Sequence, residues 1–133
     1  MIDFEAILDK QEEVRRRKRG IRRAWEKATD TSVKLSDMPR GGGDPDPMGQ
    51  KVAGIADMEA VCKQAEEELA EMRKALRRKM RRLSIWQEKD MIRKVYLEGE
   101  SIQRAAVEIG YEYRQAWRYL KSGRETINGL KMS

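Results

Sequence analysis

The residues best suited to chemistry lie between positions 101 and 121, where cationic, amide and phenolic side chains follow a segment of small residues. Such side chains donate hydrogen bonds to base edges in the major groove and to phosphate oxygens. The candidate DNA-binding residues are Tyr113, Arg114, Gln115, Arg118, Lys121 and Arg104. The pattern predicts recognition of double-stranded DNA without any covalent change in it.

The composition lacks the residues on which most enzyme active sites depend. The chain has no histidine, so the usual zinc, haem, Ser-His and Cys-His sites cannot form, and its single Cys62 cannot form an internal disulfide. Carboxylate-only hydrolases and Mg²⁺ nucleases stay open in principle, but we find no Gly-rich phosphate loop and no spaced acidic cluster. We therefore predict a protein that is not an enzyme, with no catalytic residue, cofactor or metal, and a buried, unreactive Cys62.

A turn between two short helices is expected to aim the candidate DNA-binding residues. Ser101 is the predicted N-cap of a helix that ends near residue 109, Gly110 tolerates a positive φ, and a fourth helix starts near Glu112. Ala106 and Gly110 have the spacing of a helix-turn-helix, in which two backbones approach closely. The residues expected to face the core are Ala116 and Leu120. The alternative is an ordinary packing unit whose arginines are solvated.

A third helix should precede this turn. Ser84 and Gln87 have the spacing of a capping box, which predicts a helix from near Ile85 to a stop at Gly99. The face expected to be buried consists of Ile85, Ile92, Val95 and Tyr96.

The three tryptophans have different expected roles. Trp25 and Trp86 are predicted to be core or interface residues. Trp117 either contacts a thymine methyl or a sugar, or covers the hydrophobic core, and packing is the expectation.

Two long helices are predicted upstream, over residues 4–29 and 55–83. The apolar residues of the second recur every three or four positions, which is typical of a coiled-coil seam. They are Ile55, Met58, Cys62, Ala65, Leu69, Met72, Leu76 and Leu83. Those of the first are Phe4, Ile7, Val14, Ile21, Trp25 and Ala28.

Charge favours one orientation for these helices. Each begins acidic and turns basic, so antiparallel pairing sets opposite charges together and parallel pairing sets like charges together. We predict an antiparallel, coiled-coil-like hairpin joined by a Gly/Pro-rich loop at 30–52. Most of the charge in the basic runs 15–23 and 73–82 is expected to be solvated or neutralised, although phosphate contact stays open.

The overall composition agrees with a helical protein that binds a polyanion. The 133 residues carry a net charge of +6 and a pI near 9.5, which suits a polyanionic partner. No apolar run reaches the roughly 20 residues of a membrane span. We expect a cytoplasmic, all-α protein with a hairpin over residues 1–83 and a DNA-binding domain over 84–133.

Two stretches carry a resemblance to a known family. They are LSDMPRGGGDPDPMGQKVAGIADME at 35–59 and VYLEGESIQRAAVEIGYEYRQAWRYLKSGRETI at 95–127. The chain resembles phage- and prophage-encoded regulators of Gram-positive bacteria, of the ArpU/RinA late-gene activator type. Their C-terminal helix-turn-helix is similar to region four of sigma factors. Glu112 stands where they usually carry a serine or threonine cap. The resemblance covers nearly the whole chain and implies an activator of late or packaging genes in the bacterial host cytoplasm.

Our hypothesis is a phage-type, sequence-specific transcriptional regulator that binds duplex DNA. We expect a homodimer formed through the hairpin, with host RNA polymerase as a further candidate partner, because one module makes few contacts. Two alternatives stay open. One is a small-terminase-like DNA-packaging adaptor, and the other is a helical protein-interaction module that acts on a host protein.

Overall fold

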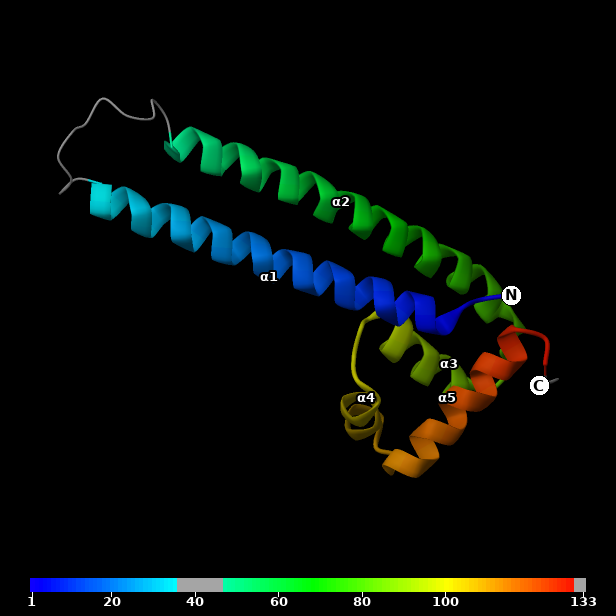
Figure 1. Cartoon of the computed structure of the whole chain (residues 1–133). Coiled ribbons are helices and arrows are strands. Elements are labelled where there is room, and N and C mark those ends of the chain that lie inside the picture. The colour runs from blue at the N-terminus through cyan, green and yellow to red at the C-terminus, as the bar shows by residue number, and fades with distance from the viewer. Residues whose placement is uncertain (36–46, 131–133) are drawn as a thin grey trace. The chain divides into compact units, whose positions relative to one another are not determined.

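The computed structural model describes residues 1–35 and 47–130, with side chains at all of these positions except 30–35 and 47–51. Every regular element in these ranges is helical, which confirms the predicted all-α fold class (Figure 1). None of the helices described is long and apolar enough to cross a membrane. Contacts divide the chain into two compact units, one of residues 1–11 with 68–133 and one of residues 12–67.

Two long helices run through both units. Helix α1 spans Phe4–Leu35 and α2 spans Pro47–Lys79. Residues 30–35 and 47–52 of the predicted loop are therefore helical, and residues 36–46 lie outside the described residues. Pro47 occupies the first helical position, where its missing N–H removes no helical hydrogen bond. The sequence prediction treated this proline as a break, whereas it begins a helix.

Within residues 12–67 the two helices bury their apolar seams. The buried side chains are Val14, Ala28, Ile55, Cys62 and Ala65. Burial raises the pKa of the Cys62 thiol, and Glu66 beside it raises the pKa further. The thiol is thus kept in its unreactive protonated form.

Polar contacts in the same unit give the direction of the pairing. Lys18 Nζ lies 3.6 Å from Glu66 Oε1, and Trp25 Nε1 donates a 3.1 Å hydrogen bond to Glu59 Oε1. Residue numbers rise along α1 as they fall along α2, so these segments run antiparallel.

The other unit is built around five further helical elements. A 3₁₀ turn η1 (Met80–Arg82) follows α2, and helix α3 (Trp86–Ile92) continues into a π-helical turn η2 (Arg93–Leu97). Helices α4 (Ile102–Ile109) and α5 (Tyr113–Ile127) complete it. The deepest core side chains are Ile7, Leu76, Leu83, Met91, Ile92, Tyr96, Ala105, Ala106, Ala116, Leu120 and Ile127.

The ends of both long helices belong to this core. Phe4 is 4% exposed, and its ring centroid lies 4.9 Å from that of Tyr96. Residues 84–133, predicted as a separate domain, therefore share a core with the N-terminal turns of α1 and the end of α2.

Two arginines of the basic run 73–82 hold this unit together. Arg73 donates to the backbone carbonyl of Tyr96 at 2.9 Å and to Gln11 Oε1 at 2.7 Å. Arg82 donates to the carbonyl of Ile127 at 2.8 Å and so satisfies an orphan group at the end of α5. These two side chains support the structural interpretation of that run.

Some local predictions were wrong. Helix α3 has Ile85 at its N-cap, one residue after the predicted cap Ser84. Ile85 is consequently exposed and does not join the buried face. Trp86 begins the helix on its solvent side and is 58% exposed, and Trp25 is 44% exposed because its indole reaches Glu59 at the rim of the seam. Neither is a core residue, and a role at an interface stays a prediction for both.

Candidate nucleic-acid interface

A short turn joins α4 to α5. Ser101 caps α4 as predicted, accepting a 3.1 Å hydrogen bond from the backbone N–H of Arg104. Gly110 ends α4 with φ of 91°, which is the positive value predicted. The carbonyl of Ala106 accepts hydrogen bonds from the N–H groups of both Gly110 and Tyr111, at 2.9 and 2.8 Å. This closure leaves little freedom in the direction of the chain that enters α5.

Ring packing ties the turn to α5. The ring centroids of Tyr111 and Tyr119 lie 5.2 Å apart. Ala116 and Leu120 are completely buried, as predicted. Because buried residues fix one side of α5, the opposite side is presented to solvent in a defined orientation.

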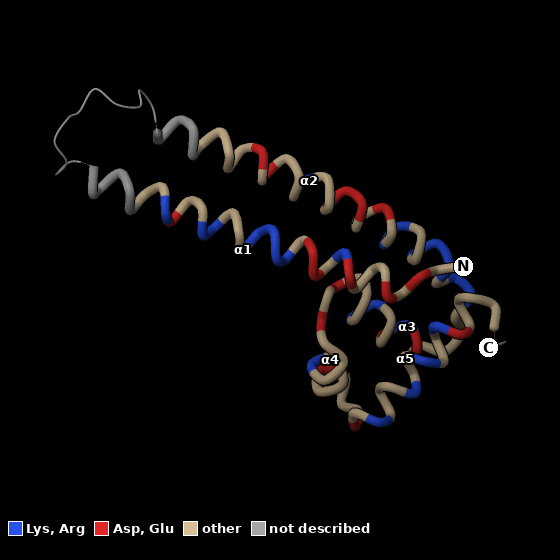
Figure 2. The backbone as a smooth tube through the Cα atoms, in the orientation of Figure 1, with Lys and Arg blue, Asp and Glu red and all other residues tan. Residues whose placement is uncertain are grey.

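Three cations share that solvent side. Arg114, Arg118 and Lys121 are separated by steps of four and three residues, so they lie on one face of the helix, and all three are exposed. Figure 2 shows in blue the positions of basic residues along the α5 backbone. We call Arg114, Arg118 and Lys121 the cationic face. None of them makes an ion pair or hydrogen bond with any part of the chain that the structure describes. Their charges are therefore available to an anionic partner.

The other predicted residues of α5 flank this face. Gln115 lies on one side of it and is exposed. Tyr113 and Trp117 lie on the other side, four residues apart, and are 54% and 40% exposed. We call Tyr113 and Trp117 the aromatic edge. Trp117, expected to pack on the core, is more than half buried and keeps the rest of its surface in solvent.

Arg104 belongs to a separate cluster on α4. Its Nε lies 3.1 Å from Glu108 Oε1, and Lys94 Nζ lies 3.0 Å from Glu108 Oε2. Hydrogen bonds from Lys94, then from Glu100 and Arg104, lower the pKa of Glu108 to about 2, whereas burial raises that of Glu100. Arg104 is thus partly neutralised, unlike the cations of α5.

The cap of α5 also bears on anion binding. Glu112 is the N-cap residue and makes no side-chain cap hydrogen bond. Its carboxylate is exposed beside the first turn, where the helix dipole favours negative charge. A serine or threonine at this position could cap α5 through its hydroxyl group, and Glu112 makes no such hydrogen bond.

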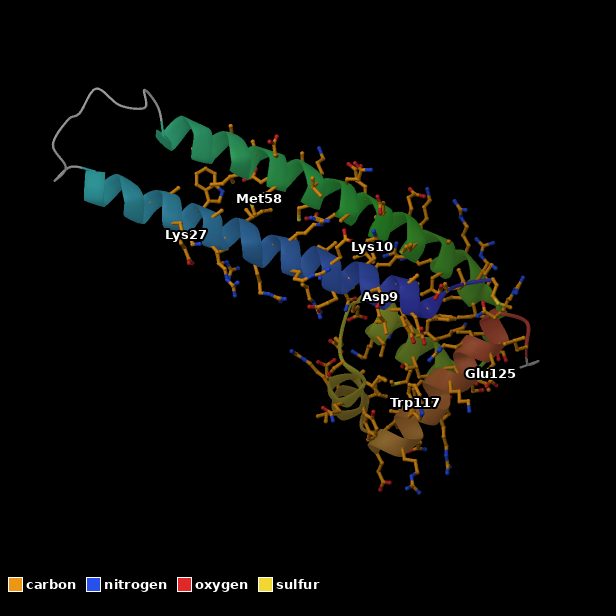
Figure 3. All side chains as sticks on the ribbon, viewed as in Figure 1. Asp9, Lys10, Lys27, Met58, Trp117 and Glu125 are labelled. Atoms are coloured by element: carbon orange, nitrogen blue, oxygen red, sulfur yellow. The ribbon has the colours of Figure 1, made fainter. Side chains whose placement is uncertain are left out.

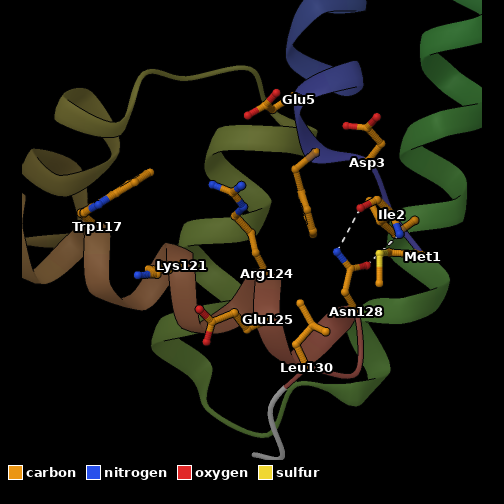
Figure 4. Close-up of a pocket in the computed structure, with 11 residues that line it drawn as sticks. Met1, Ile2, Asp3, Glu5, Trp117, Lys121, Arg124, Glu125, Asn128 and Leu130 are labelled. Carbon is orange, nitrogen blue, oxygen red and sulfur yellow. Dashed lines mark hydrogen bonds between the residues drawn. The ribbon is translucent and has the colours of Figure 1, made fainter.

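An open groove of about 650 Å³ borders the aromatic edge (Figure 4). Trp117, Lys121 and Arg124 of α5 form one wall, and the N-terminal residues form the other. Asn128 closes one end because its amide exchanges hydrogen bonds with the backbone of Ile2, at 2.7 and 3.0 Å. No sequence pattern predicts this groove, because the residues of its two walls are more than a hundred positions apart in the chain.

A buried polar pair under α5 also escaped sequence analysis. Ser122 Oγ donates to Glu88 Oε1 at 2.5 Å, and Glu88 is only 2% exposed. The two side chains couple α5 to α3 beneath the cationic face. No group of three or more His, Cys, Asp or Glu side chains that could hold a metal occurs in the described residues.

Comparisons with protein-family models, with curated proteins and with solved structures give no match to this chain. The family resemblance of the two quoted stretches therefore stays a prediction.

Proposed function

We propose that the chain is a non-enzymatic transcriptional regulator of the phage type, which binds duplex DNA through α5. In this proposal α4, the turn at 110–112 and α5 act as a helix-turn-helix, and α5 enters the major groove. The observation that carries it is the cationic face, whose three charges have no partner among the described residues. Duplex DNA supplies phosphates and base-edge acceptors to such a helix.

Fixed orientation supports sequence-specific rather than only electrostatic binding. Arg114 lies in the first turn of α5, where recognition helices meet base edges, and Arg118 and Lys121 follow further along the same face. The closed turn and the buried Ala116 hold that face rigidly. We assign Arg114 and Gln115 to base contacts and Arg118 and Lys121 to phosphates.

Residues 12–67 offer a surface for subunit association. A second groove, of about 580 Å³, is lined by Gly20, Met58, Val61 and polar neighbours. Met58 lies between the helices, 3.5 Å from where a Cβ on Gly20 would be (Figure 3). Met58 and Val61 are 38% and 47% exposed, and covering them would remove apolar surface from water. We propose a homodimer that forms here and reads two half-sites in the bacterial cytoplasm, with RNA polymerase as a further partner.

Fluorescence anisotropy with labelled duplexes selected from genomic DNA tests the function. Arg118→Ala should weaken binding to all sequences and reduce the salt slope by about one, the value for one lost phosphate contact. Arg114→Ala should instead lower the preference for the selected sequence, by about 1–3 kcal/mol if both base contacts are lost.

A matched control distinguishes a specific role of α5 in DNA binding from an effect of net charge. Arg22→Ala/Arg23→Ala removes two exposed arginines from α1, whereas Arg114→Ala/Arg118→Ala removes two from α5. If both double variants lose the same affinity, DNA binding depends on overall charge and not on α5. The mass of the assembly in solution gives a second readout, because a ring of many subunits would favour the DNA-packaging adaptor over the dimer.

A further inference from the structure

The aromatic edge presents two partly exposed rings to solvent. Tyr113 and Trp117 occupy one ridge of α5, and the ridge continues to Lys121. Ala116 and Leu120 are fully buried beneath it, whereas Tyr113 and Trp117 are 54% and 40% exposed. Exposure of apolar ring surface to water is unfavourable, and a bound partner would remove part of this surface from solvent.

The indole N–H of Trp117 is also unused. In the other unit Trp25 Nε1 is hydrogen-bonded to Glu59, whereas Trp117 makes no hydrogen bond with any described residue. Its neighbours one turn away on the helix are Arg114 and Lys121, and neither forms an ion pair with an acidic side chain in the described part of the chain. The ring thus combines an apolar plane with adjacent positive charge.

We infer that the aromatic edge contacts thymine 5-methyl groups in the major groove, so that Trp117 sets a preference for thymine next to the base pair read by Arg114. This inference rests on the proposed function. In an intact duplex the faces of the bases are stacked, and the thymine methyl is the apolar group that the major groove exposes. Arg114 and Lys121 flank the ring. Arg114 would bind a base edge and Lys121 a phosphate, and together they would hold the ring in the major groove of the DNA.

Replacing thymine by deoxyuridine removes this methyl and leaves the base pairing unchanged. With the best-bound selected duplex, we expect the wild-type chain to bind the uracil form about three- to fivefold more weakly for each methyl buried. Trp117→Ala should bind both forms with nearly the same affinity. Trp86→Ala is the matched control, because Trp86 is an equally large exposed ring on α3, and it should retain the full difference.

A second measurement does not depend on removing the ring. Trp25→Phe/Trp86→Phe leaves Trp117 as the single tryptophan, and its emission should change more with the thymine duplex than with the uracil duplex. Unchanged helical circular dichroism in each variant excludes misfolding.

The possible failures can be told apart. Equal affinity of the wild-type chain for both duplexes overturns the thymine contact, and so does an equal loss on both from Trp117→Ala. In either case the proposed function stands if Arg114→Ala/Arg118→Ala still abolishes selective binding. If that double variant binds like the wild-type chain, the proposed function falls first.

Discussion

The hydrogen bond between Ser122 and Glu88 gives a sharp test of how α5 is held. Ser122 Oγ lies 2.5 Å from Glu88 Oε1, and Glu88 Oε2 is buried with no hydrogen-bond partner among the described residues. Ser122→Ala removes the donor and leaves the carboxylate buried. Because hydrogen bonds to charged groups contribute about 1.5–3 kcal/mol, we expect the free energy of unfolding to fall by about 2 kcal/mol. The thermal midpoint should fall by roughly 6–10 °C for a chain of this size.

Urea unfolding followed by far-UV circular dichroism measures this loss. Glu88→Met/Ser122→Ala removes both partners, so no buried charge remains, and most of the lost stability should return. A Ser122→Ala protein within about 0.5 kcal/mol of wild type, the range of ordinary surface substitutions, would refute the reasoning. So would a double variant less stable than Ser122→Ala, since Glu88 would then contribute through its packing alone.

Other predictions concern the same unit and the backbone. Phe4→Ala should cost about 3–5 kcal/mol in urea unfolding, because a buried ring is lost and leaves a cavity. Gly110→Ala should cost about 1–2 kcal/mol from its positive φ alone, since no atom lies within 4 Å of the added Cβ. Gly54→Ala, equally unobstructed but inside α2, should instead stabilise by up to about 1 kcal/mol. The folded pKa of Glu108 is about 2, below the usual 4.5, so its stabilising contribution is present above pH 4.5 and is lost as the pH falls toward 2. Glu108→Gln should flatten the pH dependence of unfolding in that window.

Local signals in the sequence predicted most of the helices. The cap at Ser101 and the glycines at 99 and 110, with φ of 77° and 91°, are consequences of residue type at single positions, and the sequence is enough to identify them. The seams of α1 and α2 follow from the spacing of apolar residues. The prediction at Pro47 was wrong because proline can either interrupt a helix or occupy its first position. The surrounding structure decides which of the two occurs.

Contacts between distant residues could not be predicted in this way. Phe4 packs on Tyr96 and Arg82 binds the carbonyl of Ile127, and neither pair has a periodic pattern that joins its members. The boundary proposed at residue 83 was placed where the apolar seam of the second long helix ends and a new helix cap begins, whereas contacts place the ends of the long helices with the C-terminal helices.

Some features of the candidate site follow from the sequence, and others depend on tertiary contacts. Exposure of Arg114, Arg118 and Lys121 follows from the helical period once α5 is assigned. The pairing of Arg104 with Glu108 was readable as an i, i+4 pair, but the contribution of Lys94 from η2 needed the tertiary structure. Glu108 is therefore the reason that Arg104 differs from the other predicted DNA-binding residues.

Net charge alone says little about how strongly this chain would bind DNA. Arg73 and Arg82 satisfy backbone carbonyls, and Lys18 is paired with Glu66, so part of the positive charge has a structural role. If Arg118 and Lys121 make all the phosphate contacts, these two cations set the salt slope to no steeper than about −1.8 per subunit. A steeper slope would mean that unpaired arginines elsewhere, such as Arg22, also contact phosphate. The slope per subunit, measured with and without Arg22→Ala/Arg23→Ala, therefore tells whether DNA is held by α5 alone or also by the long helices.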